Sequence, residues 1–197
     1  MSGVNATPCH TLKLKAMPVL FPTPAADFDH PLDILDGCHE RIRRQCTTLA
    51  RISEHLMAGR DAAPAQESAR AIVRYFDTAG MHHHHDEEED LFPALEAAAP
   101  ESERAAVRGL TGRLRQDHVR LDAQWSEMRA NLCAIAEGRQ WHLDARKAQA
   151  FADAYDRHIA TEEAQLLPLA RRLLDEEATR RMGAHMAERR GVVRRTL

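Results

Sequence analysis

The sequence predicts an all-α protein, an up-down-up-down four-helix bundle with an irregular N-terminal arm and a short C-terminal helical tail. Apolar residues recur at alternating steps of three and four along four long segments, and no segment shows the sustained alternation of a strand. The connections between these segments are short, which favours antiparallel packing of sequential helices. We expect the arm over residues 1–30, the bundle over residues 31–176 and a polar, Arg-rich tail over residues 177–197.

Proline and glycine residues bound the first two helices. The first helix should begin at Pro31, because proline suits the opening turn of a helix, and it should end near Gly59. The second helix should follow the stretch around Pro64 and end near Pro100. Both segments carry an apolar stripe at helical spacing, so each should bury one face in the bundle.

The third helix has the most regular stripe in the chain, over residues 107–135, and should stop near Gly138. The fourth should run from about Leu143 to Leu173. A short fifth helix is compatible with the tail at 177–197, whose arginines should form a solvated face.

Charge balance and hydropathy exclude several classes of partner. The 197 residues include 27 basic and 30 acidic side chains, so no global field would attract nucleic acid or an anionic membrane. No apolar run approaches the roughly 20 residues that span a bilayer, and the N-terminus lacks the apolar core of a signal peptide. The cysteines lie far apart, without metal-binding spacing. We therefore expect a cytoplasmic protein with no nucleic acid or membrane partner.

One motif, H-x-x-x-E-E-x-x-L-[F/L]-P, occurs twice, beginning at His83 and at His158. In each copy a glutamate follows the histidine by four residues, as Glu87 and Glu162, so both side chains project from one helical face. Each pair can therefore offer one nitrogen and one oxygen ligand to the same metal site.

Polar residues interrupt all four apolar stripes at matching depths. The interrupting residues are His39, His83, Glu87, His118, His158 and Glu162. Burying them without partners would cost several kcal/mol each. Counting residues from each turn, at about 1.5 Å per residue, puts all six in one layer. The first two and last two helices also resemble two copies of one hairpin, which suits two metal ions bridged by Glu87 and Glu162. Imidazole and carboxylate ligands suit iron, manganese or zinc, of which we expect iron.

Neighbouring residues have simpler interpretations. His82 and His85 should be solvated, because they lie one position before and two positions after His83 and so rotate about 100° and about 200° away from the stripe. Glu88 and Glu163 follow the expected ligands directly and should support them or lie at the surface. Core packing is the expected role of the remaining candidates: Tyr155, Cys38 and Cys46.

These residues resemble the hemerythrin-like, or HHE cation-binding, family over residues 31–175. The matching elements are the lone histidine of the first helix, H-x-x-x-E in the second, the Asp117-His118 pair in the third and H-x-x-x-E in the fourth. The resemblance implies an oxo- or hydroxo-bridged non-haem di-iron centre used for oxygen binding, oxygen or nitric oxide sensing, or iron handling. The ferritin-like pattern E-x-x-H has the reverse order and fits less well.

One departure from the oxygen-carrying hemerythrins bears on function. Those proteins place two histidines four residues apart in the third helix, but the positions four residues from His118 are Leu114 and Asp122. The fifth histidine is missing from that place, although His84 or Asp122 could complete the coordination. With two histidines on each iron, both ions would keep exchangeable positions.

We therefore expect a protein that binds or reacts with oxygen, nitric oxide or peroxide in sensing or stress response. The chain has no separate acid, base or nucleophile outside the layer, so a sensor or responder is favoured over a turnover enzyme. The alternatives are an iron store or donor, a peroxide or nitric oxide reductase, and a zinc site that only staples the bundle. The sequence identifies no protein partner.

Overall fold

The computed structural model of the protein describes residues 27–192, and every regular element in that range is a helix, as the sequence predicts. In chain order the elements are α1 (Pro31–Met57), α2 (Ala63–Tyr75), η1 (Phe76–Gly80), α3 (Met81–His85), η2 (Asp86–Leu91), α4 (Phe92–Ala98), α5 (Glu101–Ala136), α6 (Ala145–Thr161), η3 (Glu162–Leu166), α7 (Leu167–Leu173) and α8 (Glu176–Arg189). The η elements are π-helical turns. Most of the expected arm, residues 1–26, lies outside the described residues. No described helix has the length and apolar character needed to cross a membrane.

The predicted helix ends agree with the structure to within a few residues. Pro31 opens α1, and Gly59 follows its end with a φ of +62°, a conformation that favours glycine. Pro64 lies inside the first turn of α2, where we had expected it in the preceding loop, because the missing N–H of proline costs nothing there. The fourth helix begins at Ala145, since Asp144 caps it by accepting hydrogen bonds from the N–H groups of the first turn.

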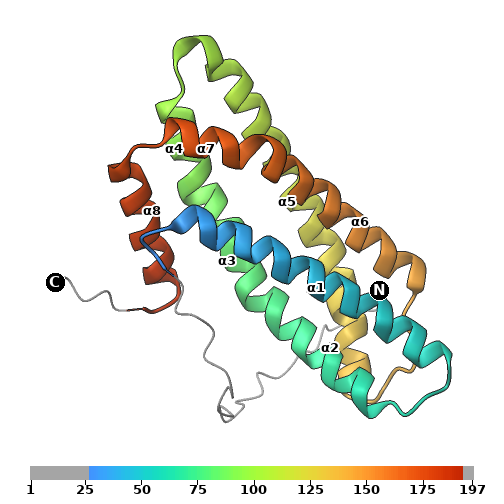
Figure 1. Ribbon diagram of the computed structural model, residues 1–197. Helices are drawn as coiled ribbons and strands as arrows, with labels where there is room; N and C mark the ends of the chain where they lie inside the picture. Colours follow the sequence, from blue (N-terminus) through green and yellow to red (C-terminus); the bar gives the residue numbers. More distant parts are fainter. Residues whose placement is uncertain (1–26, 193–197) are drawn as a thin grey trace, which may run out of the picture.

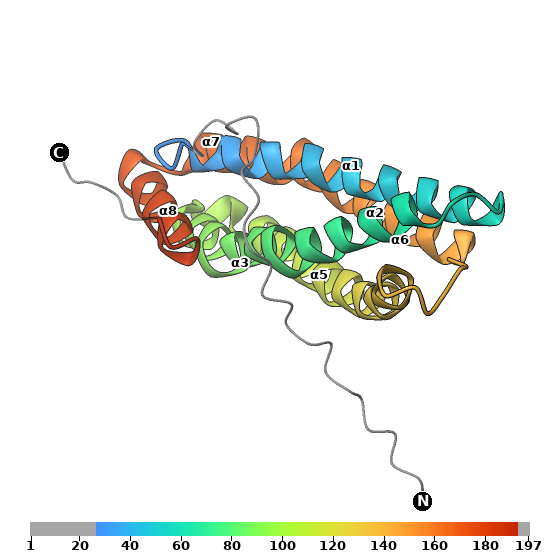
Figure 2. The ribbon, with the colours of Figure 1, turned by 90° about the horizontal axis from the view of Figure 1, so that it is seen from below.

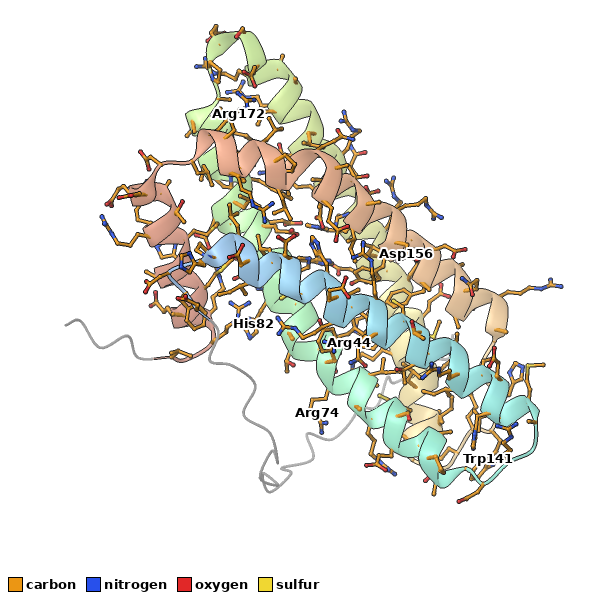
Figure 3. The ribbon with its side chains drawn as sticks, viewed as in Figure 1. Arg44, Arg74, His82, Trp141, Asp156 and Arg172 are labelled. Atoms are coloured by element: carbon orange, nitrogen blue, oxygen red, sulfur yellow. The ribbon has the colours of Figure 1, made fainter. Side chains whose placement is uncertain are left out.

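The helices pack as a bundle with α8 across one end (Figure 1). Seen from below, α1 lies with α7 in one layer, and α3 lies with α5 in the other (Figure 2). Contacts join α1 to α6, α2 to α5, α1 to α2 and α5 to α6. Charged side chains such as Asp156 on α6 line the outside, and Trp141 lies in the α5–α6 connection at the end far from α8 (Figure 3).

Two hydrophobic clusters fill the bundle, one on each side of a polar layer. One cluster includes Ile42 of α1 and Leu121 of α5, and the other includes Leu35 and Leu114 of the same two helices. His39 falls between the two clusters along α1, as His118 does along α5. The core is thus continuous except at the level of the histidines and glutamates.

The predicted fifth helix is present as α8, and it packs against α1 and η2. Gly183 of α8 packs directly against the backbone of Phe28. A Cβ at position 183 would lie 1.8 Å from the Phe28 carbonyl oxygen. Only glycine permits so close an approach.

The expectation that the tail arginines form a solvated face is wrong for two of them. Arg189 and Arg190 donate to the fully buried Asp86 of η2, at 2.6 Å to Oδ1 and 2.5 Å to Oδ2 respectively. Arg189 also donates to Asp90. Their carboxylate partners lie about a hundred residues upstream, so the tail composition alone does not reveal them.

Candidate metal centre

The six residues predicted as ligands come together in one buried layer. Two groups offer ligand atoms that all lie within 4.8 Å of one another. The first group consists of His39, His83, Glu87 and Glu162, and the second of Glu87, His118, His158 and Glu162. None of the six is more than 2% exposed. Depth counting therefore predicted their proximity correctly, and their binding of metal stays a prediction.

Glu87 and Glu162 belong to both groups, and each directs one oxygen to each group. The Glu162 oxygens lie 3.1 Å from Nε2 of His39 and 2.8 Å from Nε2 of His158. The Glu87 oxygens lie 3.8 Å from Nε2 of His83 and 3.3 Å from Nε2 of His118. Each of the two carboxylates therefore lies between two pairs of imidazoles.

Several nitrogen and oxygen atoms of the layer have no hydrogen-bond partner among the described residues. Within residues 27–192, Nε2 of His39 and His83 and both carboxylate oxygens of Glu87 and Glu162 are buried without a hydrogen-bond partner. Such atoms cost about 1–3 kcal/mol each when they stay unpaired. Nitrogen and oxygen donors that converge in this way fit metal cations, which would satisfy them together.

Comparison with known proteins agrees with this geometry. The hemerythrin HHE cation-binding domain matches residues 30–170 of the chain. The chain belongs to the hemerythrin HHE family. It is also 30% identical, over 176 residues, to a protein of Haemophilus influenzae described as uncharacterized, and the match covers 89% of this chain and 99% of that protein. HHE domains bind metal cations, typically iron, and the buried histidine and glutamate groups of the layer could hold a metal.

In both copies of the HHE motif a π-helical turn starts at or next to the glutamate. The carbonyl oxygen of Glu87 accepts from the N–H of Phe92, and that of Glu162 accepts from the N–H of Leu167, five residues on in each case. A proline follows directly, Pro93 or Pro168. Proline has no N–H to donate to the carbonyl four residues back, and its ring crowds that carbonyl. The turn before the proline therefore widens. The repeated proline is thus the sequence signal for this turn.

Carboxylates outside the layer hold the histidines of the HHE site in orientation. Glu88 Oε1 lies 2.6 Å from Nδ1 of His118, and Glu163 Oε1 lies 3.3 Å from Nδ1 of His39. A proton held on Nδ1 by these carboxylates leaves the Nε2 lone pair directed into the layer. Glu88 and Glu163 therefore support the ligands, one of the two roles expected of them.

Sequence reasoning missed the role of Arg43. Its guanidinium donates two hydrogen bonds of 2.8 Å to Glu163, one to each oxygen. Arg43 lies four residues after His39 on the same face of α1, so its position and charge were available as a signal.

Without metal, the pKa values of the layer show where protons would bind. Burial, together with Glu162, raises the pKa of Glu87 well above its ordinary value. Burial opposes protonation of His118, but the neighbouring Glu162 and Glu87 carboxylates outweigh it and raise the His118 pKa to about 10. Burial likewise acts to raise the pKa of Glu162, yet His158 and His118 hold it well below the ordinary value. A cation that binds in the layer must displace the proton on His118, and the raised pKa of Glu87 adds to this competition between cation and protons.

The residues around the motif differ in their burial. His85 is exposed, as expected. His82, which was also expected to be solvated, is half-buried, and His84 is buried within the layer. Tyr155 packs in the core against Phe76 and Phe151. The predicted core positions of Cys38 and Cys46 are confirmed as well.

Proposed function

We propose that this HHE domain holds two iron ions and binds or reacts with oxygen, nitric oxide or peroxide, in sensing or in a stress response. The observation that carries the proposal is the shared use of Glu87 and Glu162, each with one oxygen toward each group. His39 and His83 would hold one ion, and His118 and His158 the other. An iron pair held there would supply a redox centre that binds small oxidants and exchanges electrons with them.

The choice of iron rests on the donor set and on the family. Imidazole and carboxylate ligands suit iron, manganese and zinc, and within the described range neither group includes a cysteine. Two shared carboxylates favour a pair of ions over a single structural zinc, because a lone ion would leave one set of imidazoles unsatisfied. Up-down-up-down topology is part of the proposal, supported by the contacts that join α1, α2, α5 and α6 in a ring.

The enclosure of the layer favours a small ligand and a retained metal. All six residues are buried, and neither of two surface cavities, one bordered by Gln124 and Lys147 and the other by Arg113 and Gln165, is lined by any of them. Oxygen, nitric oxide and peroxide are small enough to reach such a site through fluctuations of the packing. An iron store or donor would need labile metal, which this burial disfavours.

The test is metal analysis and an absorption spectrum of protein purified from its native host. We expect close to two irons per chain and a near-ultraviolet ligand-to-iron charge-transfer band in the oxidised protein. Zinc in the same amount, or iron well below one per chain, would reject the proposal. Titration with nitric oxide in the presence of a reductant then separates a sensor, which binds stoichiometrically, from a reductase, which continues to consume the gas.

A further inference from the structure

A chain of ring contacts runs from the surface of α5 to the buried layer. Trp125 of α5 is half-buried, and its indole lies against the ring of Phe76, with centroids 4.7 Å apart. Phe76 in turn contacts the buried Tyr155, at 5.5 Å between centroids. Tyr155 faces His84 at 6.2 Å, and His84 stacks on His118 of the layer at 4.0 Å. Neighbouring rings thus connect the solvent side of α5 with the candidate metal centre.

Phe151 gives this chain of rings a second path. Its ring lies 5.0 Å from that of Tyr155 and 6.0 Å from that of Trp125. Tryptophan and tyrosine lose a single electron more easily than phenylalanine does, so an oxidisable side chain stands at each end and phenylalanines lie between. Because electron tunnelling weakens steeply with the gap between redox groups, contacting rings provide short steps. Core packing alone explains the phenylalanines, but not the polar surroundings of Trp125.

The indole N–H of Trp125 has a proton acceptor beside it. Nε1 donates to Oδ1 of Asp77 at 3.1 Å, and Nε of Arg129 donates to both oxygens of the same carboxylate, at 2.9 and 2.8 Å. A carboxylate within hydrogen-bond distance can take the indole proton. An indole that releases its proton as it is oxidised becomes a neutral radical instead of a cation, so the electron leaves more easily.

We propose that Trp125 is an electron port, which supplies single electrons to the buried layer through Phe76 and Tyr155 while Asp77 takes the indole proton. The inference rests on the proposed di-iron function, with peroxide as the oxidant. Reduction of one peroxide molecule to two waters takes two electrons and two protons. When the iron pair supplies only one electron, Trp125 supplies the other, and solvent supplies the two protons. The indole is then left as a neutral radical with its own proton on Asp77.

A one-electron donor of the ascorbate class restores the port. It reaches the half-buried indole from solvent and gives up one electron, and Asp77 returns the proton to Nε1. The donor does not need to enter the bundle, whose ligand layer is buried. The port therefore moves oxidising equivalents away from the ligand histidines to a place where a reductant can reach them.

Trp141 is the matched control, because it is the second of the two tryptophans of the chain and is 57% exposed. Iron-loaded, full-length protein receives hydrogen peroxide without reductant, and peptide mass spectrometry locates the oxidised side chains. We expect oxygen added to Trp125, little change at Trp141, and loss of the Trp125 product when ascorbate is present. Oxidants that diffuse through solvent attack the more exposed ring first, so oxidation mainly at Trp141, or equally at both, overturns the proposal.

Rapid-freeze electron paramagnetic resonance observes the radical itself. We expect a tryptophan radical in the wild type and in Trp141→Phe, and its loss in Trp125→Phe and in Asp77→Asn, whose amide cannot take the proton. Circular dichroism checks that the variants are folded. If Phe at position 125 prevents folding, Trp141→Phe grown with ring-deuterated tryptophan decides the matter. A narrowed signal then supports the port, and an unchanged line shape overturns it.

The outcomes separate the two proposals. Two irons per chain, with Trp125 unoxidised and no tryptophan radical, would overturn the electron port and leave the di-iron function standing. Oxidation of Trp125 to the same extent in iron-free protein would also overturn the port alone. Wild-type protein that takes up no iron would overturn the function and the port together.

Discussion

The two groups of the site share Glu87 and Glu162 but differ in the residues behind them. In the first group, Arg43 holds Glu163, which in turn holds His39. In the second group, the position equivalent to Arg43 is Asp122, which faces a further histidine. Duplication of a hairpin thus explains the shared ligands, and substitutions at aligned positions around them make the two halves chemically different.

The turns that carry the glutamates differ as well. The η2 turn packs against α8 and includes the fully buried Asp86, which accepts from Arg189 and Arg190. The equivalent position in the second copy of the motif is Thr161, which is half-buried and donates to a carbonyl of its own helix. The half of the site on η2 therefore depends on the C-terminal helix for its stability.

The largest effect should follow from removal of a shared carboxylate. Glu162→Ala removes an oxygen from both groups, so we expect loss of both metal ions, whereas His83→Ala should weaken mainly the first. Metal-to-protein ratios after gel filtration measure the difference. Equal retention of metal by Glu162→Ala and the wild type would contradict the bridging role, and Glu40→Ala, an exposed change on α1, is the control.

Loss of the buried Asp86 carboxylate should destabilise the protein by about 3 kcal/mol, because Arg189 and Arg190 would lose a buried partner. Chemical denaturation of Asp86→Ala, compared with Thr161→Ala at the equivalent position, gives the measurement. We expect the Thr161 variant to change by no more than about 0.5 kcal/mol. Similar losses in both variants would show that the two halves do not differ in this way.

Metal binding should strengthen as pH rises from 7 toward 10. The His118 pKa is raised from 6.5 to about 10 in the metal-free fold, so His118 holds a proton that metal must displace, and the raised pKa of Glu87 acts in the same direction. The folded metal-free state holds more protons than the unfolded state. The stability from His118 is therefore full below about pH 6.5 and is lost as pH rises through about 10.

Calorimetry in buffers of different ionisation enthalpy counts the protons released when metal binds. Thermal unfolding at different pH values measures how the stability of the metal-free and of the metal-loaded protein depends on pH. We expect release of the His118 proton at pH 7, because its pKa in the metal-free fold is about 10. Binding without proton release would show that the layer is already deprotonated before metal arrives.

The smallest expected effect concerns Arg43, which holds Glu163 against His39 of the first group. Arg43→Met frees Glu163, which loses two hydrogen bonds, so metal affinity there should fall about tenfold. Arg44→Met changes the exposed neighbour and should have no effect. If both variants bind metal alike, Glu163 orients His39 without help from Arg43.

Most of the candidate ligands were predictable from the sequence, because they are polar residues within otherwise apolar helical stripes. His39 and His118 replace apolar residues in regular stripes, and the repeated motif identifies the other four. His84 was harder to assign because adjacent positions on a helix rotate by about 100°, and one of them was expected to leave the core. In the structure both His83 and His84 of α3 are buried, so the buried face of this helix is wide enough to include two adjacent positions.

Contacts between distant parts of the chain were not predictable from periodicity. Asp86 lies in a run of acidic residues that resembles a solvated surface, and its partners Arg189 and Arg190 lie in a tail that resembles another. Opposite charges in two polar segments pair only when the fold brings them together. The close approach of Gly183 to Phe28 has the same origin.

Mössbauer spectroscopy of ⁵⁷Fe-loaded, oxidised protein in an applied field tests the central claim most directly. Two ferric ions bridged by Glu87 and Glu162 should couple antiferromagnetically, so we expect a diamagnetic ground state that accounts for all of the iron. A magnetically split spectrum of isolated high-spin iron would contradict the account, because it would mean that the two groups do not hold a bridged pair.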